Sequence, residues 1–233
     1  MIFQHKNLPS LSKNFEKIKL NILVVGGGRW AVITINELLN NFKNLKYIFI
    51  VTNNQNIIQS FPKKFKEKII IQRRIKKKYF HKIEHAIVVN KNSDHYESAK
   101  NLLKNKFNIL VEKPFVKGLR QFKAIKKLSQ KKKKLVHISM PFFFSYYFFF
   151  LKKNINSNCN ELLFNWHDPK NDKRYGKIKK YDKSVSYLED TIYHVYGILN
   201  CLFGPKEMSV IFVKNYIDTG LLTFMYGKLK IKL

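Results

Sequence analysis

The chain has 233 residues, enough for one large domain or two modest ones, and 45% of them are hydrophobic, which excludes wholesale disorder. Against 15 Asp and Glu it carries 45 basic residues, 40 Lys but only 5 Arg, for a formal net charge of +30. Specific recognition of bases and phosphates favours Arg, and the lysines are scattered along the whole chain. With 23 Asn and only 4 Ala, this composition indicates an AT-rich genome rather than a specific nucleic-acid partner.

The cysteine content argues against a disulfide-stabilised or metal-binding protein, and the hydropathy argues against a secreted or membrane-spanning one. Cys159 and Cys201 supply neither a disulfide framework nor metal-ligand spacing, so we expect a reducing cytoplasmic compartment and no metal. Lysines interrupt the N-terminal region where a secretory signal needs an apolar run. The most apolar stretch, residues 141–151, has 11 residues, whereas a bilayer requires roughly 20, so we expect no membrane span. A core strand running into a buried helix is predicted there instead.

Strands and helices alternate through the first half of the chain. Residues 18–25 (IKLNILVV) are typical of a buried parallel strand, and residues 31–42 have apolar side chains near helical spacing. Residues 55–68 are expected to hold a short helix. The same patterns predict further strands over 45–54, 68–74, 85–90, 107–111 and 135–140, and helices after residue 94 and over 119–134. This alternation predicts a parallel sheet covered by helices on both faces.

The second half is more aromatic and differently organised. A helix is predicted over residues 187–203, followed by strand-like runs at 208–214 and 221–227.

A glycine turn follows the first predicted strand. Gly26-Gly27-Gly28-Arg29-Trp30-Ala31 matches G-x-G-x-x-[GA] and opens a predicted helix, which is the context that this motif requires. Gly26 would permit the sharp turn, Gly28 would let the backbone approach a pyrophosphate, and Ala31 would let the helix pack close to the sheet. The phosphates would bind the exposed N–H groups at the helix N-terminus. A glycine turn without a ligand is the structural alternative.

The end of the second predicted strand bears on the choice of cofactor. A carboxylate usually holds the ribose hydroxyls here, but this sequence has Thr52, Asn53 and Asn54. Without a carboxylate to repel a 2′-phosphate, and with Lys63 or Lys64 to neutralise one, NADP is slightly preferred over NAD.

Three further stretches contain candidate site residues. Asn90, Asn92 and His95 lie in the run AIVVNKNSDHYES, and Glu112-Lys113-Pro114 follows the fifth predicted strand. Asp190 and His194 are four residues apart on the predicted helix 187–203, so they share one helical face. A histidine there is suited to proton transfer because its pKa lies near working pH. The structural alternative is that Asp190 caps the helix and His194 is an ordinary helix residue.

These motifs resemble the glucose–fructose oxidoreductase/inositol dehydrogenase (Gfo/Idh/MocA) family over residues 20–205. The resemblance implies a Rossmann doubly wound parallel sheet at 18–138, an α+β substrate domain at 139–233 that is curtailed relative to the family, and pairing into a homo-oligomer. It implies that Lys113 and His194 manage the proton while Asp190 orients the substrate or the ammonium of Lys113. It also implies a set of cofactor-binding residues: Gly26, Gly28, Arg29, Trp30, Ala31, Thr52, Asn53, Asn90, Asn92, His95, Glu112 and Lys113.

Two functions follow from the resemblance. The first is an NAD(P)-dependent oxidoreductase that moves a hydride between nicotinamide and a carbonyl, hydroxyl or imine carbon of a small substrate. The alternative is a non-catalytic or degenerate dinucleotide-binding protein of the same fold, which the curtailed second domain favours. A basic nucleic-acid-binding protein is a third class, and the diffuse lysines weigh against it.

Overall fold

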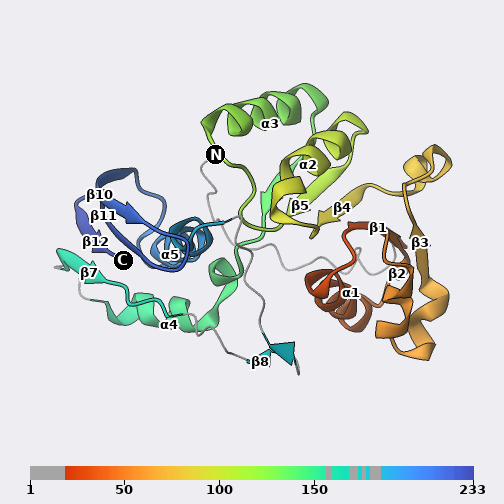
Figure 1. Cartoon of the computed structure of the whole chain (residues 1–233), viewed down its shortest axis with the longest axis horizontal. Helices are drawn as coiled ribbons and strands as arrows, with labels where there is room; N and C mark the ends of the chain where they lie inside the picture. Colours follow the sequence, from red (N-terminus) through yellow and green to blue (C-terminus); the bar gives the residue numbers. More distant parts are fainter. Residues whose placement is uncertain (1–18, 156–158, 168–172, 175–176, 179–184) are drawn as a thin grey trace. The chain divides into compact units, whose positions relative to one another are not determined.

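The computed structural model describes residues 19–155, 159–167, 173–174, 177–178 and 185–233 (Figure 1). The chain divides into two compact units. The N-terminal unit ends at Ser139, and the C-terminal unit begins at Met140.

The N-terminal unit is built on a six-stranded parallel sheet. Its strands have the order β3-β2-β1-β4-β5-β6, and every neighbouring pair is parallel. The order reverses beside β1, because β2 lies on one side of it and β4 on the other. In open α/β sheets, ligands bind at such a switch point, outside the carboxyl ends of the strands. The strands are β1 (Leu20–Val25), β2 (Leu45–Val51), β3 (Ile69–Gln72), β4 (His85–Val88), β5 (Asn108–Val111) and β6 (Val136–Ile138).

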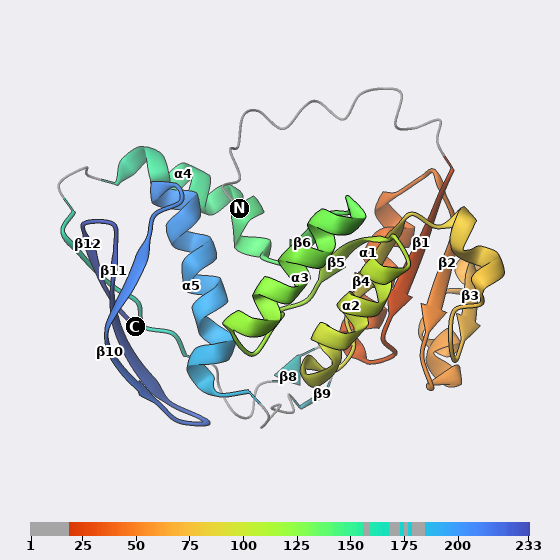
Figure 2. The ribbon, with the colours of Figure 1, turned by 90° about the horizontal axis from the view of Figure 1, so that it is seen from above.

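Helices bury both faces of this sheet, as the alternation of elements predicts. Successive side chains of β1 point to opposite faces, so Leu23 and Val24, both fully buried, belong to different cores. Ile35 of α1 (Arg29–Asn41) packs in the core with Val24, while Leu103 of α2 (His95–Lys104) packs in the core with Leu23. The second core also includes a residue of α3 (Leu119–Lys132), and α2 and α3 lie side by side (Figures 1 and 2). The predicted doubly wound fold is confirmed.

The C-terminal unit packs one long helix, α5 (Tyr187–Phe203), against a four-stranded sheet (Figure 2). Phe224 and Ile231 of the sheet and Leu199 of α5 are fully buried in this core. The sheet order is β10-β11-β12-β7, with β7 parallel to β12 and the other pairs antiparallel. These strands are β7 (Glu161–Leu163), β10 (Met208–Asn215), β11 (Gly220–Tyr226) and β12 (Leu229–Lys232); the unit also has β8 (Lys173–Arg174), β9 (Lys177–Ile178) and α4 (Tyr146–Asn154). The predicted smaller α+β domain is confirmed.

Two elements differ in detail from those predicted. Residues 141–151 form a 3-10 turn, η6 (Pro141–Phe144), and then α4, rather than a core strand and a buried helix. Tyr146 and Tyr147 of α4 are 83% and 64% exposed, so the apolar run does not mark a buried element. The helix expected over residues 55–68 is a pair of 3-10 segments, η2 (Gln55–Ser60) and η3 (Lys63–Lys68). They are separated at Pro62, which lacks the N–H that a continuous helix needs.

Within the described part of the chain, no helix is long and apolar enough to cross a membrane. Nor do three or more His, Cys, Asp or Glu side chains among the described residues gather as a metal site requires. Cys159 and Cys201 are both free thiols.

Tyr226 makes the stability of the C-terminal unit pH-dependent. Its side chain is 2% exposed, and its hydroxyl donates a hydrogen bond of 2.7 Å to the Gly204 carbonyl. Burial raises the pKa of Tyr226 to about 12, from about 10 in an unfolded chain. Because the folded state holds the proton more tightly, this contribution is complete below pH ~10 and is lost as the pH rises toward ~12.

We therefore expect the free energy of unfolding of the wild type to fall by about 2–3 kcal/mol more than that of Tyr226→Phe between pH ~10 and ~12. At neutral pH the variant should be about 1 kcal/mol less stable, since it loses one hydrogen bond. Urea unfolding at neutral pH and across this alkaline range measures both differences. Parallel profiles for the two proteins would show that Tyr226 is not the group responsible.

Candidate dinucleotide site

The glycine turn begins with a backbone conformation that requires glycine. Gly26 has φ +142°, and a Cβ at this position would lie 2.7 Å from the carbonyl oxygen of Val89, at the end of β4. Its N–H donates to the carbonyl of Val51, at the end of β2. Gly26 therefore holds the turn between the carboxyl ends of the strands on either side of β1.

Gly27 packs against the segment that follows β2. A Cβ here would lie 1.9 Å from Thr52 Oγ1. Asn54 Nδ2 donates to the Gly27 carbonyl at 3.0 Å, and Asn54 N donates to Thr52 Oγ1, also at 3.0 Å. Thr52 and Asn54 thus brace the turn from β2, while Asn53 is exposed beside them. The cofactor-binding residues predicted from the sequence do not include Asn54, although its position at the end of β2 is the signal that could have identified it.

Gly28 leaves the N-terminus of α1 open. It is the N-cap residue and is exposed, no side chain caps the helix, and the first turn has no acidic residue. A Cβ added at Gly28 would meet no atom of the described residues within 4 Å. A phosphate can therefore approach the first N–H groups of α1, where the helix dipole favours negative charge. This open cradle fits the pyrophosphate of a dinucleotide.

The next residues of the motif line the start of α1. Ala31 is fully buried, as close packing of the helix on the sheet requires. Trp30 is 50% exposed, and the Arg29 guanidinium lies 5.7 Å from the centroid of its indole ring. Arg29, the first residue of α1, therefore packs against the next residue of the motif.

His95 ties together the loops that follow β4 and β5. Its side chain is 1% exposed, and its Nδ1 and Nε2 lie 2.8 Å and 3.2 Å from the carbonyl oxygens of Pro114 and Asn90. Because both ring nitrogens face backbone carbonyls, the imidazole acts here as an internal brace. The family resemblance includes His95 among the cofactor-binding residues, and in the structure its ring is buried between the backbone carbonyls of Pro114 and Asn90.

Asn90 has an acceptor whose partner is missing from the described residues. Its Nδ2 donates to Ser98 Oγ at 2.8 Å, but its Oδ1 is buried without a hydrogen-bond partner in the described part of the chain. Asn92, in η5 (Asn92–Asp94), is half-buried nearby in the sequence. A buried acceptor of this kind is stabilised by a donor from a ligand or a water molecule.

Glu112 and Lys113 follow β5 directly. Both are half-buried, and Lys113 N donates to Glu112 Oε2 at 3.3 Å. The Lys113–Pro114 peptide bond is cis, and the Pro114 carbonyl is the one that faces His95. The N-terminal unit thus brings all its predicted cofactor-binding residues to the carboxyl ends of β1, β2, β4 and β5.

The remaining two predicted residues, Asp190 and His194, belong to the C-terminal unit. They lie on α5, and both are half-buried. The helix is capped by Ser186, whose Oγ accepts from Glu189 N while Glu189 Oε2 accepts from Ser186 N. The alternative in which Asp190 caps the helix is therefore wrong. The His194 ring stacks on the indole of Trp166.

The parallel sheet, its switch point and the open glycine turn define an NAD-binding Rossmann protein. Residues 20–140 match the model of a family described as the oxidoreductase family with an NAD-binding Rossmann fold, GFO_IDH_MocA. This match covers more than half of the chain, so the chain belongs to that family, as its motifs predict.

Solved structures share the fold at low sequence identity. An oxidoreductase from Bacillus cereus is 20% identical, with a TM-score of 0.68, over 92% of this chain and 63% of that one. A candidate oxidoreductase from Bacillus subtilis is 19% identical, with a TM-score of 0.69, over 93% and 63%. A candidate NADPH-dependent oxidoreductase from Desulfitobacterium hafniense is 16% identical, with a TM-score of 0.68, over 92% and 65%. The chain therefore spans less than two thirds of their length, and no curated protein matches its sequence.

Proposed function

We propose that the protein is an NAD(P)-dependent oxidoreductase that transfers a hydride between nicotinamide and a carbonyl, hydroxyl or imine carbon of a small substrate. The observation that carries this proposal is the open cradle at Gly28, at the switch point of the sheet. Membership of an NAD-binding oxidoreductase family supports it.

The chain's own residues would bind the cofactor, orient the substrate and move a proton. Backbone N–H groups at the start of α1 hold the pyrophosphate, and the Asn90 Oδ1 acceptor is available to a donor from the cofactor. The nicotinamide, when bound, supplies the hydride acceptor or donor. The Lys113 ammonium polarises the reacting oxygen and stabilises negative charge on it. His194 exchanges the proton with this oxygen, and Asp190 orients the substrate or Lys113.

NADP is the proposed cofactor, in slight preference to NAD. The described residues that follow β2 up to Asn54 include no carboxylate, and Asn54 uses its amide on the Gly27 carbonyl. A 2′-phosphate would therefore meet no negative side chain from this segment. The word NADPH in the name of the Desulfitobacterium protein agrees with this preference.

Two further proposals concern location and partners. Two free thiols are compatible with a reducing cytoplasmic compartment. A homo-oligomer is supported by β10, an edge strand whose eight residues are all exposed, because apolar edge strands are sites of pairing. Sedimentation equilibrium tests the homo-oligomer.

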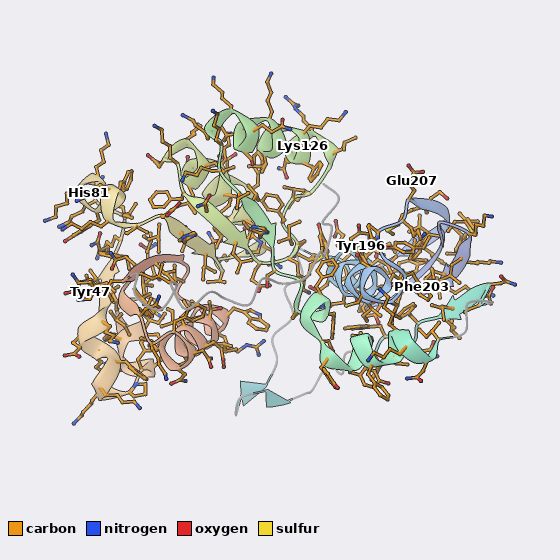
Figure 3. The ribbon with its side chains drawn as sticks, turned by 180° about the vertical axis from the view of Figure 1, so that it is seen from behind. Tyr47, His81, Lys126, Tyr196, Phe203 and Glu207 are labelled. Carbon is orange, nitrogen blue, oxygen red and sulfur yellow. The ribbon has the colours of Figure 1, made fainter. Side chains whose placement is uncertain are left out.

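We propose no specific nucleic-acid or membrane partner, because the basic side chains, such as Lys126 on α3, are distributed over the whole chain (Figure 3).

Thermal unfolding with NADPH, NADP⁺, NADH and NAD⁺ tests the proposal, and we expect the largest rise in melting temperature with an NADP form. The measurement needs moderately high salt. A hollow of about 480 Å³ at the amino ends of β1, β2 and β3 contains Lys19, Lys43, Lys46 and Lys68, and it could attract phosphates non-specifically. If no dinucleotide raises the melting temperature at this salt concentration, the proposal is contradicted. A rise without turnover of any small alcohol, aldehyde or imine would favour the non-catalytic alternative.

A further inference from the structure

An aromatic cluster surrounds the His194 imidazole in the C-terminal unit. The rings of Trp166 and His194 are stacked, with centroids 5.1 Å apart and an angle of 6° between their planes. The Phe142 ring meets His194 edge-on, at 5.1 Å and 79°, and it meets Trp166 in the same way, at 6.0 Å and 80°. Three separate segments contribute these rings: η6, the loop after β7 and α5.

Trp166 is held independently of His194. Its backbone carbonyl accepts a hydrogen bond from the hydroxyl of Tyr187, the first residue of α5. Its side chain also packs against the core that α5 forms with the sheet. The indole is therefore a fixed surface, tied to the N-terminal turn of the same helix that carries His194.

The cluster is not part of the buried core. Trp166, Phe142 and His194 are all half-buried, whereas the core positions of α5 such as Val195 and Leu199 are fully buried. Aromatic rings that serve packing alone gain most when they are removed from water. The imidazole therefore keeps access to solvent while the indole covers one of its faces.

Stacking also suits proton transfer geometrically. The indole covers a face of the imidazole, while the ring nitrogens lie in the ring plane and direct their hydrogen bonds along it. Contact with the face therefore restricts rotation of the ring about its last side-chain bond without using a nitrogen. A proton-transfer group must be held close to the productive orientation, and neighbouring side chains provide this by packing.

We propose that Trp166 is a positioning residue for His194, which fixes the plane of the imidazole so that its nitrogens face the substrate. This role rests on the proposed function of His194 as the proton-transfer residue. The orientation of the ring, however, is a property of the C-terminal unit alone, so it is measurable without cofactor or substrate.

NMR of the His194 ring in the full-length protein tests the proposal with Trp166→Leu and Trp166→Phe. In the wild type we expect upfield-shifted imidazole protons and one ring orientation, because the indole current shields them. Trp166→Leu should remove the upfield shift and average the ring between orientations. Trp166→Phe should restore the single orientation in part, since it keeps an aromatic face.

Phe164→Leu is the matched control. Phe164 also packs against the core of the C-terminal unit, and no ring contact joins it to His194 among the described residues. We expect this variant to lower the melting temperature without averaging the His194 ring. The proposal is overturned if the His194 signals are unchanged in Trp166→Leu, or if Phe164→Leu alters them equally. Failure of all dinucleotides to raise the melting temperature would instead contradict the proposed function and leave the ring measurement as it is.

Discussion

Gly28→Asp is expected to abolish dinucleotide binding without harming the fold. An Asp side chain at this position has room, because a Cβ there meets no atom of the part of the chain that the structure describes within 4 Å. It would occupy the place of the pyrophosphate and add negative charge beside it, so we expect affinity to fall at least about 100-fold. Stability should be unchanged or slightly higher, because Asp is a favourable N-cap residue. Isothermal titration with NADPH and thermal unfolding measure the two effects.

The matched control is Gly118→Asp, in the same unit. Gly118 is the N-cap residue of α3, is exposed and also has no atom within 4 Å of an added Cβ. The same new charge at an equivalent helix end should leave NADPH affinity at its wild-type value. Equal losses in both variants would show that binding depends on net charge rather than on the glycine turn.

Gly26→Ala should have the largest effect on stability. The residue has φ +142°, a conformation that L side chains rarely adopt, and its new Cβ would lie 2.7 Å from the Val89 carbonyl oxygen. That oxygen belongs to backbone at the end of β4, so it cannot move without disturbing the sheet. Strain and overlap together should lower the free energy of unfolding by at least about 3 kcal/mol. Urea unfolding followed by circular dichroism measures this loss.

Gly118→Ala serves as the control here, since its φ is 177° and its surroundings are open. We expect a change of at most about 1 kcal/mol, because the entropy that alanine removes from the unfolded chain is offset by its poorer preference for an N-cap position. If Gly26→Ala proved as stable as this control, the turn would not have the tight conformation described above.

The strand, turn and helix around Gly26 could be predicted because local signals agree there. An apolar β-branched run, three glycines and a helical pattern all indicate the same unit, and it forms as β1 and α1. α5 occupies the predicted residues because Ser186 and Glu189 cap its N-terminus. Such signals depend only on neighbours in the sequence.

Other features could not be predicted because they depend on contacts across the fold. Asn54 braces Gly27 only because β2 lies beside β1, and their hydrogen bond joins residues 27 positions apart in the chain. The spacing of His95 from Asn92 does not reveal that its ring faces the carbonyls of Asn90 and Pro114. Similarly, the apolar run at 141–151 does not show which of its aromatic side chains will be exposed.

The most direct test of the central claim is to map NADPH binding on the backbone amides by NMR, in moderately high salt. We expect the largest changes at Gly26–Ala31, which form the glycine turn and the start of α1, with further changes at Asn54, which braces the turn, and at Asn90, whose Oδ1 is an unpaired buried acceptor among the described residues. Changes confined to the hollow around Lys43, Lys46 and Lys68 would show non-specific attraction of phosphate. That result would contradict the assignment of the glycine turn as the dinucleotide site.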